Sequence, residues 1–162
     1  MVVDHLAIGD VRITLNRVPA GRWTPTGALR SWARARLLQI GDEVLVPCPV
    51  EEALWLGAWS VQPPEMEDAV LLDEGPRQAR LALREGTQLR GLAPDDPLCL
   101  PPGAAQRSLL LSIRGPSATP GAASRAPVTM TLRLLRPEPW ARQAGEALEP
   151  LGEEPPLPLR LG

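Results

Sequence analysis

The sequence predicts an all-β fold, a small barrel or sandwich of about eight short strands with one or two short helices. Short apolar runs, several of them alternating with polar residues, are typical of strands. The 20 prolines and 14 glycines lie between these runs as turn residues. A hydrophobic fraction of 44% and a net charge of −2 exclude a fully disordered chain. The 162 residues suffice for one domain or two small ones.

The first third of the chain is expected to form strands interrupted by one helix. A first strand is expected at residues 3–8, and the alternation over 11–16 predicts the second. Thr26 is a favourable N-cap for a helix over residues 27–37, where apolar residues recur at helical spacing. A Gly-Asp turn then leads into a strand over residues 43–47.

Residues 53–59 are apolar on both faces, which predicts a strand that is covered on both sides. Trp55, Gly57 and Trp59 share one of these faces. Two indoles beside a glycine could form a platform on which a sugar ring stacks. Packing in the core or at a protein interface is the favoured interpretation, because the Asn and Asp residues that usually orient a bound sugar are missing nearby.

Five further strands are expected in the rest of the β-rich region. They cover residues 69–72, 79–84, 98–100, 109–113 and 128–134, and the last has the clearest alternation. The stretch between the last two strands, rich in Gly, Pro, Ala and Ser, is expected to be a long mobile hairpin loop. The predicted core includes Ile13, Leu15, Leu45, Leu56, Leu81, Leu83, Leu110, Met130 and Leu132.

The sequence changes character after residue 137, which sets the predicted domain boundary. Residues 1–137 are expected to form a β-rich domain. Two small modules, 1–86 and 87–137, are the alternative, because a faint repeat relates two segments at an offset of about 54 residues. Residues 138–162 are expected to form a short helix and a linker-like C-terminal tail.

This C-terminal segment is predicted to be an assembly surface. A helix over residues 140–148 would carry one apolar stripe and would be marginal alone in water. The alternating residues after it offer a strand edge that can add to another sheet. The β domain is expected to fold without the segment. The residues expected to contact a partner are Trp140, Leu148, Leu157, Leu159 and Leu161.

The inventory of side chains argues against an enzyme. The chain has no lysine, phenylalanine or tyrosine, and His5 is its one histidine, so most groups that perform covalent and acid–base chemistry are absent. Because the scarce residues share AT-rich codons, the composition indicates a GC-rich bacterial genome. No catalytic residue, cofactor or metal site is expected, since structural zinc needs four Cys or His ligands. Acidic clusters at 51–52, 65–68 and 95–96 leave a carboxylate hydrolase as a minor alternative.

The expected partners are proteins, including a second copy of the chain. Nucleic acid is not expected, because the arginines are dispersed rather than interleaved with aromatic residues. No apolar run approaches the ~18 residues of a membrane span, and the N-terminus lacks the pattern of a signal peptide. Direct membrane insertion is therefore not expected and a cytoplasmic location is. Cys48 and Cys99 are then expected to be reduced thiols in or near the core.

Two segments resemble a known family. The run from Thr26 to Trp32 (TGALRSW), followed by Leu38 to Pro47 (LQIGDEVLVP), resembles the short helix and Gly-Asp turn of surface-presentation-of-antigens (SPOA) domains. These domains occur in the cytoplasmic ring of type III secretion systems and in the flagellar switch. Residues 157–162 resemble the opening strand of a second such domain. The resemblance implies small β-rich modules that dimerise and a scaffolding role without catalysis.

The leading hypothesis is therefore a non-catalytic cytoplasmic scaffold component that works by protein–protein contact, in the setting of a type III secretion sorting platform. The alternative is a small ligand-binding β-sandwich that holds a carbohydrate on Trp55 and Trp59. Exposure of the two indoles distinguishes the hypotheses, since an exposed, coplanar pair favours the binding module.

Overall fold

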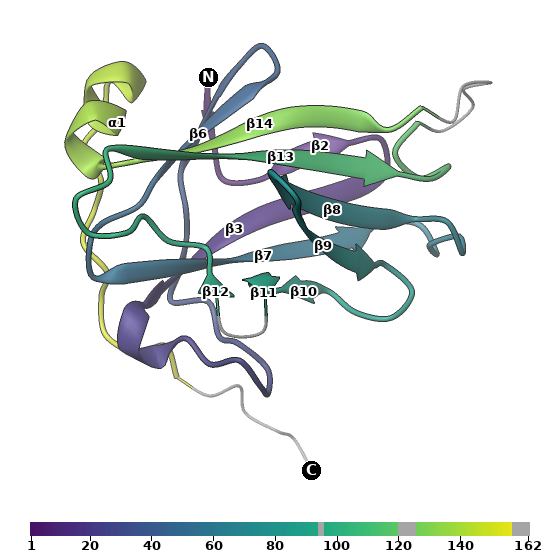
Figure 1. Cartoon of the computed structure of the whole chain (residues 1–162), viewed down its shortest axis with the longest axis horizontal. Helices are drawn as coiled ribbons and strands as arrows, with labels where there is room; N and C mark the ends of the chain where they lie inside the picture. The colour runs from purple at the N-terminus through teal and green to yellow at the C-terminus, as the bar shows by residue number, and fades with distance from the viewer. Residues whose placement is uncertain (94–95, 120–125, 157–162) are drawn as a thin grey trace.

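Two sheets pack face to face in the computed structural model, which describes residues 1–93, 96–119 and 126–156 (Figure 1). The described strands form open sheets. The protein is thus an all-β sandwich, which confirms the predicted fold class and selects the sandwich over the barrel. Within these described ranges, one α-helix and one 3-10 turn, η1 (Ala20–Arg22), accompany the strands.

The larger sheet has seven strands in the order β1-β5-β6-β14-β13-β8-β9. Neighbouring strands are antiparallel except β6 and β14, which run parallel. This parallel pair brings a late segment of the chain into the middle of the sheet. The strands are β1 (Val2–Val3), β5 (Leu37–Ile40), β6 (Glu43–Pro47), β8 (Ala69–Glu74), β9 (Arg77–Ala82), β13 (Gln106–Arg114) and β14 (Val128–Leu135).

The smaller sheet has five strands and is centred on the long antiparallel pair of β3 and β7. Its order is β10-β7-β3-β2, and β4 pairs with β3 beyond the end of β2. A separate two-stranded pair lies beside it. The strands are β2 (Leu6–Ile8), β3 (Val11–Pro19), β4 (Ala33–Arg34), β7 (Glu52–Ser60) and β10 (Gln88–Leu89), and the separate pair is β11 (Gly91–Ala93) with β12 (Asp96–Pro97).

The main core lies between the sheets and follows from the alternation of side chains along each strand. In β7, Leu54, Leu56 and Ala58 point into this core and are completely buried. Trp55, on the opposite face of β7, is also buried, so the prediction that this strand is covered on both sides is confirmed.

The predicted core residues are buried except Leu110, which is 43% exposed. Its neighbours Leu109 and Leu111 point into the core, and the alternation of β13 therefore turns Leu110 outward. Because residues 109–111 are all leucine, the sequence does not show which of them face the core. This ambiguity explains the wrong prediction for Leu110. Leu45 is buried as predicted, but on the outer face of the larger sheet rather than between the sheets.

Residues 27–37 do not form the predicted helix. The segment crosses the smaller sheet irregularly and ends in β4 and the start of β5. The backbone N–H groups of Trp32 and Ala35 donate to the carbonyl oxygens of Arg17 and Leu15, at 3.0 and 2.7 Å. The edge of β3 thus supplies hydrogen-bond acceptors that a helix would have provided internally, and this tertiary pairing overrides a weak helical propensity.

The α-helix found in the described residues, α1 (Pro137–Ala144), begins and ends earlier than the predicted helix over 140–148. Proline at the first turn suits a helix start, because its missing N–H has no partner there in any case. Gly145 ends the helix with a left-handed φ of 75°, which favours glycine. The helix packs on the outer face of the larger sheet, over β5 and β6 (Figure 1).

Residues on both sides of position 86 share the same sheets. In the larger sheet, β13 and β14 lie between β6 and β8, and in the smaller sheet β10 pairs with β7. A division into modules 1–86 and 87–137 would cut through hydrogen-bonded sheets. The order of the strands therefore favours the single β-rich domain over the two-module alternative.

Candidate functional site

The two tryptophans of the predicted carbohydrate platform do not form an exposed pair. Trp55 is 8% exposed, and its indole Nε1 donates to the carbonyl oxygen of Arg30 at 3.1 Å. Trp59 is 36% exposed, with the guanidinium of Arg34 lying 6.0 Å from the centroid of its ring. The alternative hypothesis requires two exposed indole rings side by side, and only the ring of Trp59 is partly exposed.

A second apolar cluster explains the burial of Trp55. The segment that was predicted to be helical lays Leu29 and Trp32 over the outer face of β3 and β7, and Trp23, which follows η1, packs beside them. Gln88 fixes this cover, because its amide accepts from the N–H of Leu29 at 3.0 Å and donates to the carbonyl oxygen of the same residue at 2.9 Å. The outer face of the smaller sheet is therefore largely closed by the protein itself.

Trp140, a predicted contact residue, belongs to the core of its own domain. Its side chain is completely buried against Leu38, Leu45 and Leu135, and its Nε1 donates to the carbonyl oxygen of Leu45 at 3.0 Å. Trp140 is thus not accessible to a partner, which corrects that prediction. Trp140 and Ala144 pack against the sheet of the same chain, and Leu148 lies beyond the end of the helix.

Leu148 is partly buried and lines a shallow hollow beside Arg17 and Glu149. The remaining predicted contact residues, Leu157, Leu159 and Leu161, lie outside the described residues.

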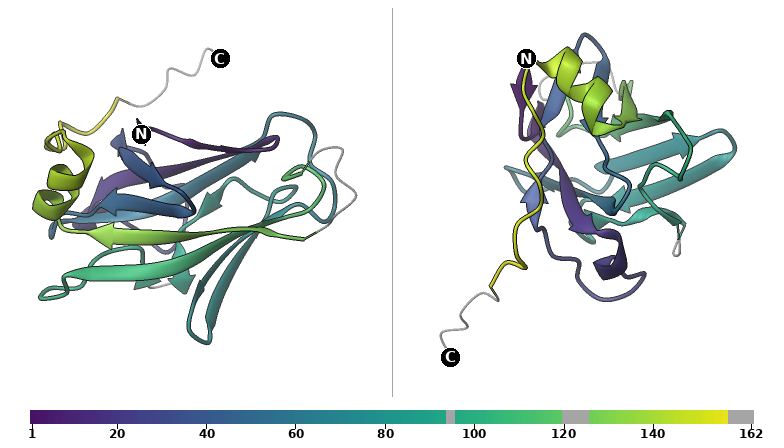
Figure 2. Two further views of the ribbon diagram at one scale, coloured as in Figure 1. Left: turned by 90° about the horizontal axis from the view of Figure 1, so that it is seen from above. Right: turned by 90° about the vertical axis from the view of Figure 1, so that its left-hand side faces the viewer.

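The described part of the C-terminal segment is held on the sandwich by arginines. Figure 2 shows it leaving α1 and running along the side of the molecule. Arg17 forms a buried, bidentate ion pair with Glu52, at 2.7 and 2.8 Å, and its remaining Nη1 donates to the carbonyl oxygen of Glu149 at 2.8 Å. Further along, the guanidinium of Arg30 lies 3.0 Å from the carboxylate of Glu154. Residues 145–156 therefore behave as part of the domain surface.

The titratable residues singled out in the sequence take up separate positions. The Nδ1 of His5 lies 2.8 Å from the Asp4 carboxylate on the surface. This hydrogen bond lowers the pKa of Asp4. Cys48 is buried and Cys99 is partly buried, and neither forms a disulfide. Burial raises the pKa of the Cys48 thiol to about 11, which makes it a poor nucleophile at neutral pH.

The acidic clusters supply ion pairs and hydrogen bonds within the fold. Glu52 pairs with Arg17, Asp68 accepts hydrogen bonds from Ser117, and Asp96 pairs with Arg77. Among the described residues, no group of three or more His, Cys, Asp and Glu side chains gathers in a way that could hold a metal ion. In the same residues, no helix has the length and apolar character needed to cross a membrane.

The partners of the arginines single out one corner of the molecule. Most arginines donate to a carboxylate or to a backbone carbonyl oxygen, as Arg17, Arg107 and Arg133 do. Within the described ranges, the arginines without such a partner are Arg80, Arg84, Arg114 and Arg142. Arg80 and Arg114 line the same surface hollow.

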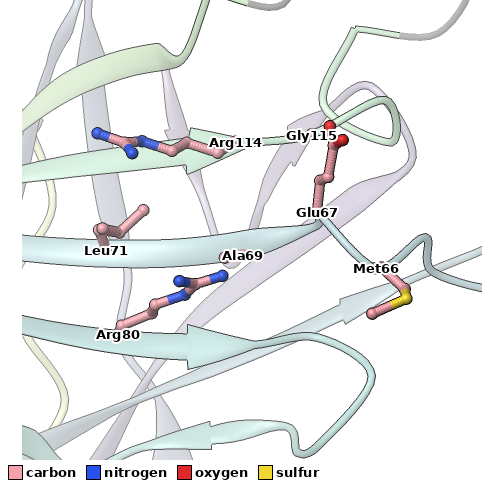
Figure 3. A pocket seen from close by; sticks show the side chains of 7 residues that line it. All are labelled: Met66, Glu67, Ala69, Leu71, Arg80, Arg114 and Gly115. Atoms are coloured by element: carbon pink, nitrogen blue, oxygen red, sulfur yellow. The ribbon is translucent and has the colours of Figure 1, made fainter.

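This hollow has a volume of about 600 Å³ and lies on the outer face of the larger sheet, over β8. The register explains its shape. Arg80 of β9 is opposite Leu71 of β8, and Arg114 of β13 is opposite Ala69 of the same strand. Ala69 and Leu71, which are only 1% and 4% exposed, thus lie between two long arginines that extend from the strands on either side (Figure 3). Met66 and Glu67, which precede β8 in the chain, line the hollow near the start of that strand (Figure 3).

The same face carries the exposed Leu110, which points outward from β13 like Arg114. We define the open face as five outward residues of β8, β9 and β13, namely Ala69, Leu71, Arg80, Leu110 and Arg114; Asp73 and Ser112 point to the same side of the sheet. The other half of the outer face of this sheet, at β5 and β6, is covered by α1.

Sequence reasoning missed the open face because its residues are far apart in the chain. Arg80 and Arg114 were counted among dispersed arginines, and only the strand order β13-β8-β9 brings them to one hollow. The alternation of the strand that contains Arg80 indicates that this side chain points outward. The sequence does not indicate which strands lie beside it. No protein-family model, curated protein or solved structure matches the chain.

Proposed function

We propose that the protein is a non-catalytic interaction component that holds a partner protein on its open face. The observation that carries this proposal is Leu110, a 43% exposed leucine in the middle of a regular sheet, next to a hollow walled by two arginines without partners. Leucine and arginine are both well suited to a protein interface, where apolar burial and bidentate hydrogen bonds add to each other.

The placement of these residues favours a protein partner over a small ligand. The hollow faces outward, and on the same face of β13 only Ser112 separates Arg114 from the exposed Leu110. Strands hold the backbone of Arg80, Leu110 and Arg114, so little backbone entropy is lost when a partner binds. An exposed Met66 at the rim, 77% exposed, adds an adaptable apolar contact.

A carbohydrate module is the weaker candidate. It rests on Trp55 and Trp59, and Trp55 is covered by the segment that contains Trp32. Trp59 alone offers one partly exposed ring.

We further propose a cytoplasmic location, which the two free thiols support because they suit a reducing compartment. The Gly-Asp turn of the segment that resembles SPOA domains lies between β5 and β6, with Gly41 at a φ of 60°. The short helix of that motif is absent from residues 27–32. Membership of a type III secretion platform therefore stays a prediction.

The experiment compares two outward-facing apolar residues. Leu110→Thr keeps a strand-forming side chain and removes the apolar surface of the open face. Ile40→Thr makes a similar change at a 51% exposed residue of β5, outside the open face. The tagged full chain is used to capture partners from its native host. We expect Leu110→Thr to weaken capture by roughly tenfold, in line with the burial of one leucine, and Ile40→Thr to leave it unchanged. Equal losses in the two variants would contradict the proposal.

A further inference from the structure

We infer that the hollow between Arg80 and Arg114 receives an acidic side chain of the partner, flanked by apolar residues. This inference rests on the proposed function and specifies the chemistry that the open face recognises. It starts from the contrast between these two arginines and the others of the chain, most of which already donate to an oxygen of the protein.

A guanidinium without a carboxylate partner has hydrogen-bond donors to offer. Both arginines are exposed, and they extend from strands that flank β8. Two strand spacings separate β9 from β13, roughly 10 Å, which leaves room for one side chain between the two arginine side chains. A carboxylate placed there can accept charge-assisted hydrogen bonds from both sides.

The rim of the hollow favours an apolar neighbour of that carboxylate. Met66 is 77% exposed at this rim, whereas Ala69 and Leu71, which lie between the arginines, are buried. An acidic residue with an aliphatic neighbour satisfies both surfaces at once, whereas a bare anion uses only the arginines.

Charge limits the partner to a small number of acidic groups. The hollow also contains the carboxylate of Glu67, beside Gly115 (Figure 3), and the whole chain has a net charge of −2. Such a surface does not attract a polyanion over long range, so a nucleic acid or a densely anionic membrane is disfavoured. A protein segment with one carboxylate matches the two unpaired arginines without requiring a dense array of negative charges.

The probe is the blocked peptide acetyl-Gly-Leu-Glu-Leu-Gly-amide, added to the full chain and followed through the side-chain Nε–H resonances of its arginines. The matched control peptide carries Gln in place of Glu. We expect the Glu peptide to shift the resonances of Arg80 and Arg114 and to bind at least fivefold more tightly than the Gln peptide. Arg80→Gln and Arg114→Gln should each weaken binding at least fivefold. Arg142→Gln, at an exposed and unpaired arginine on α1, should leave it unchanged.

Three outcomes would overturn the inference. The first is equal binding of the Glu and Gln peptides. The second is an equal response of Arg142, which would indicate unspecific attraction. The third is an equal effect of inorganic phosphate at the same concentration, which would assign a general anion site without an apolar component. If the peptide fails while Leu110→Thr still weakens partner capture, the acidic chemistry is wrong and the interaction face stands. If both experiments fail, the proposed function falls as well.

Discussion

The buried carboxylate of Asp68 accepts hydrogen bonds from both the backbone N–H and the hydroxyl of Ser117, at 3.0 and 2.5 Å. It also accepts from the N–H of Glu65 at 2.6 Å. Asp68 thus joins the turn before β8 to the turn after β13 at one end of the sandwich. Gly115 permits this approach, since its φ of +107° favours glycine and an added Cβ would lie 2.3 Å from the Asp68 carboxylate.

Replacing Asp68 by Ala should destabilise the protein by at least about 2 kcal/mol, because each buried donor that loses its acceptor costs about 1–3 kcal/mol. Ser117→Ala removes only the hydroxyl and should cost less. Urea denaturation of both variants measures the difference. A loss below about 0.5 kcal/mol for Asp68→Ala would show that the two turns are held by other contacts.

Leu132 of β14 is 1% exposed and points into the main core. Its truncation to Ala should destabilise by roughly 2–5 kcal/mol, from the lost transfer energy and the cavity left behind. Thr129→Ala, at an exposed residue on the outer face of the same strand, is the control and should change stability little. Chemical denaturation that gives similar values for both variants would be incompatible with the assigned register of β14.

Trp140 fills the space between α1 and the outer face of the larger sheet. Trp140→Ala should destabilise by about 3–5 kcal/mol. Trp140→Phe retains most of the apolar contact and loses the hydrogen bond to Leu45, so its cost should be nearer 1 kcal/mol. Removing residues 138–162 should be at least as severe as Trp140→Ala, because it uncovers Leu38 and Leu135 as well. A truncated chain that unfolds cooperatively at the denaturant midpoint of the full chain would instead support the independence expected from the sequence.

Glu74 should contribute stability that depends on pH. Arg107 donates to both its carboxylate oxygens, at 2.8 and 3.0 Å. These hydrogen bonds, with a smaller Coulombic contribution, lower the pKa of Glu74 below its ordinary value of 4.5 in the folded protein. The stabilisation is therefore fully present above pH 4.5 and is lost as the pH falls through the lowered pKa.

The difference in unfolding free energy between wild type and Glu74→Gln measures this contribution. We expect the difference to be constant near neutral pH and to shrink as the pH drops below 4.5. Arg107→Gln should show the same trend, because it removes the other half of the pair. A difference that does not change between pH 7 and pH 3 would mean that the pair does not perturb the carboxyl group.

Much of the sandwich could be predicted from the sequence because alternation is a local property. β3, β7 and β14 occupy the expected regions, and most of the expected core residues are buried. Local pattern failed where two interpretations fit equally well. Because β13 contains three consecutive leucines, its sequence does not show whether Leu110 or its two neighbours face the core. The apolar spacing over residues 27–37 fits a helix but serves an irregular cover over Trp55.

The candidate site could not be predicted, for a topological reason. Arg80 and Arg114 share a hollow only because β8 lies between β9 and β13. The parallel pairing of β6 with β14 likewise joins segments that no short-range signal relates. Trp140 shows the converse case, in which the apolar stripe was visible and the partner was the same chain. An amphipathic pattern identifies the helix face that will be buried, but it does not show whether the same chain or a partner buries it.

The most direct test of the interaction face places a photo-crosslinking amino acid at position 110 of the full chain, in its native host, and at position 40 as the control. Both side chains are exposed apolar residues, at 43% and 51%, on different parts of the larger sheet. We predict covalent adducts of higher mass from position 110 and none from position 40, with the adducts at 110 reduced by Arg80→Gln combined with Arg114→Gln. No adduct at position 110, or the same adducts from both positions, would contradict the assignment of the open face as the partner-binding surface.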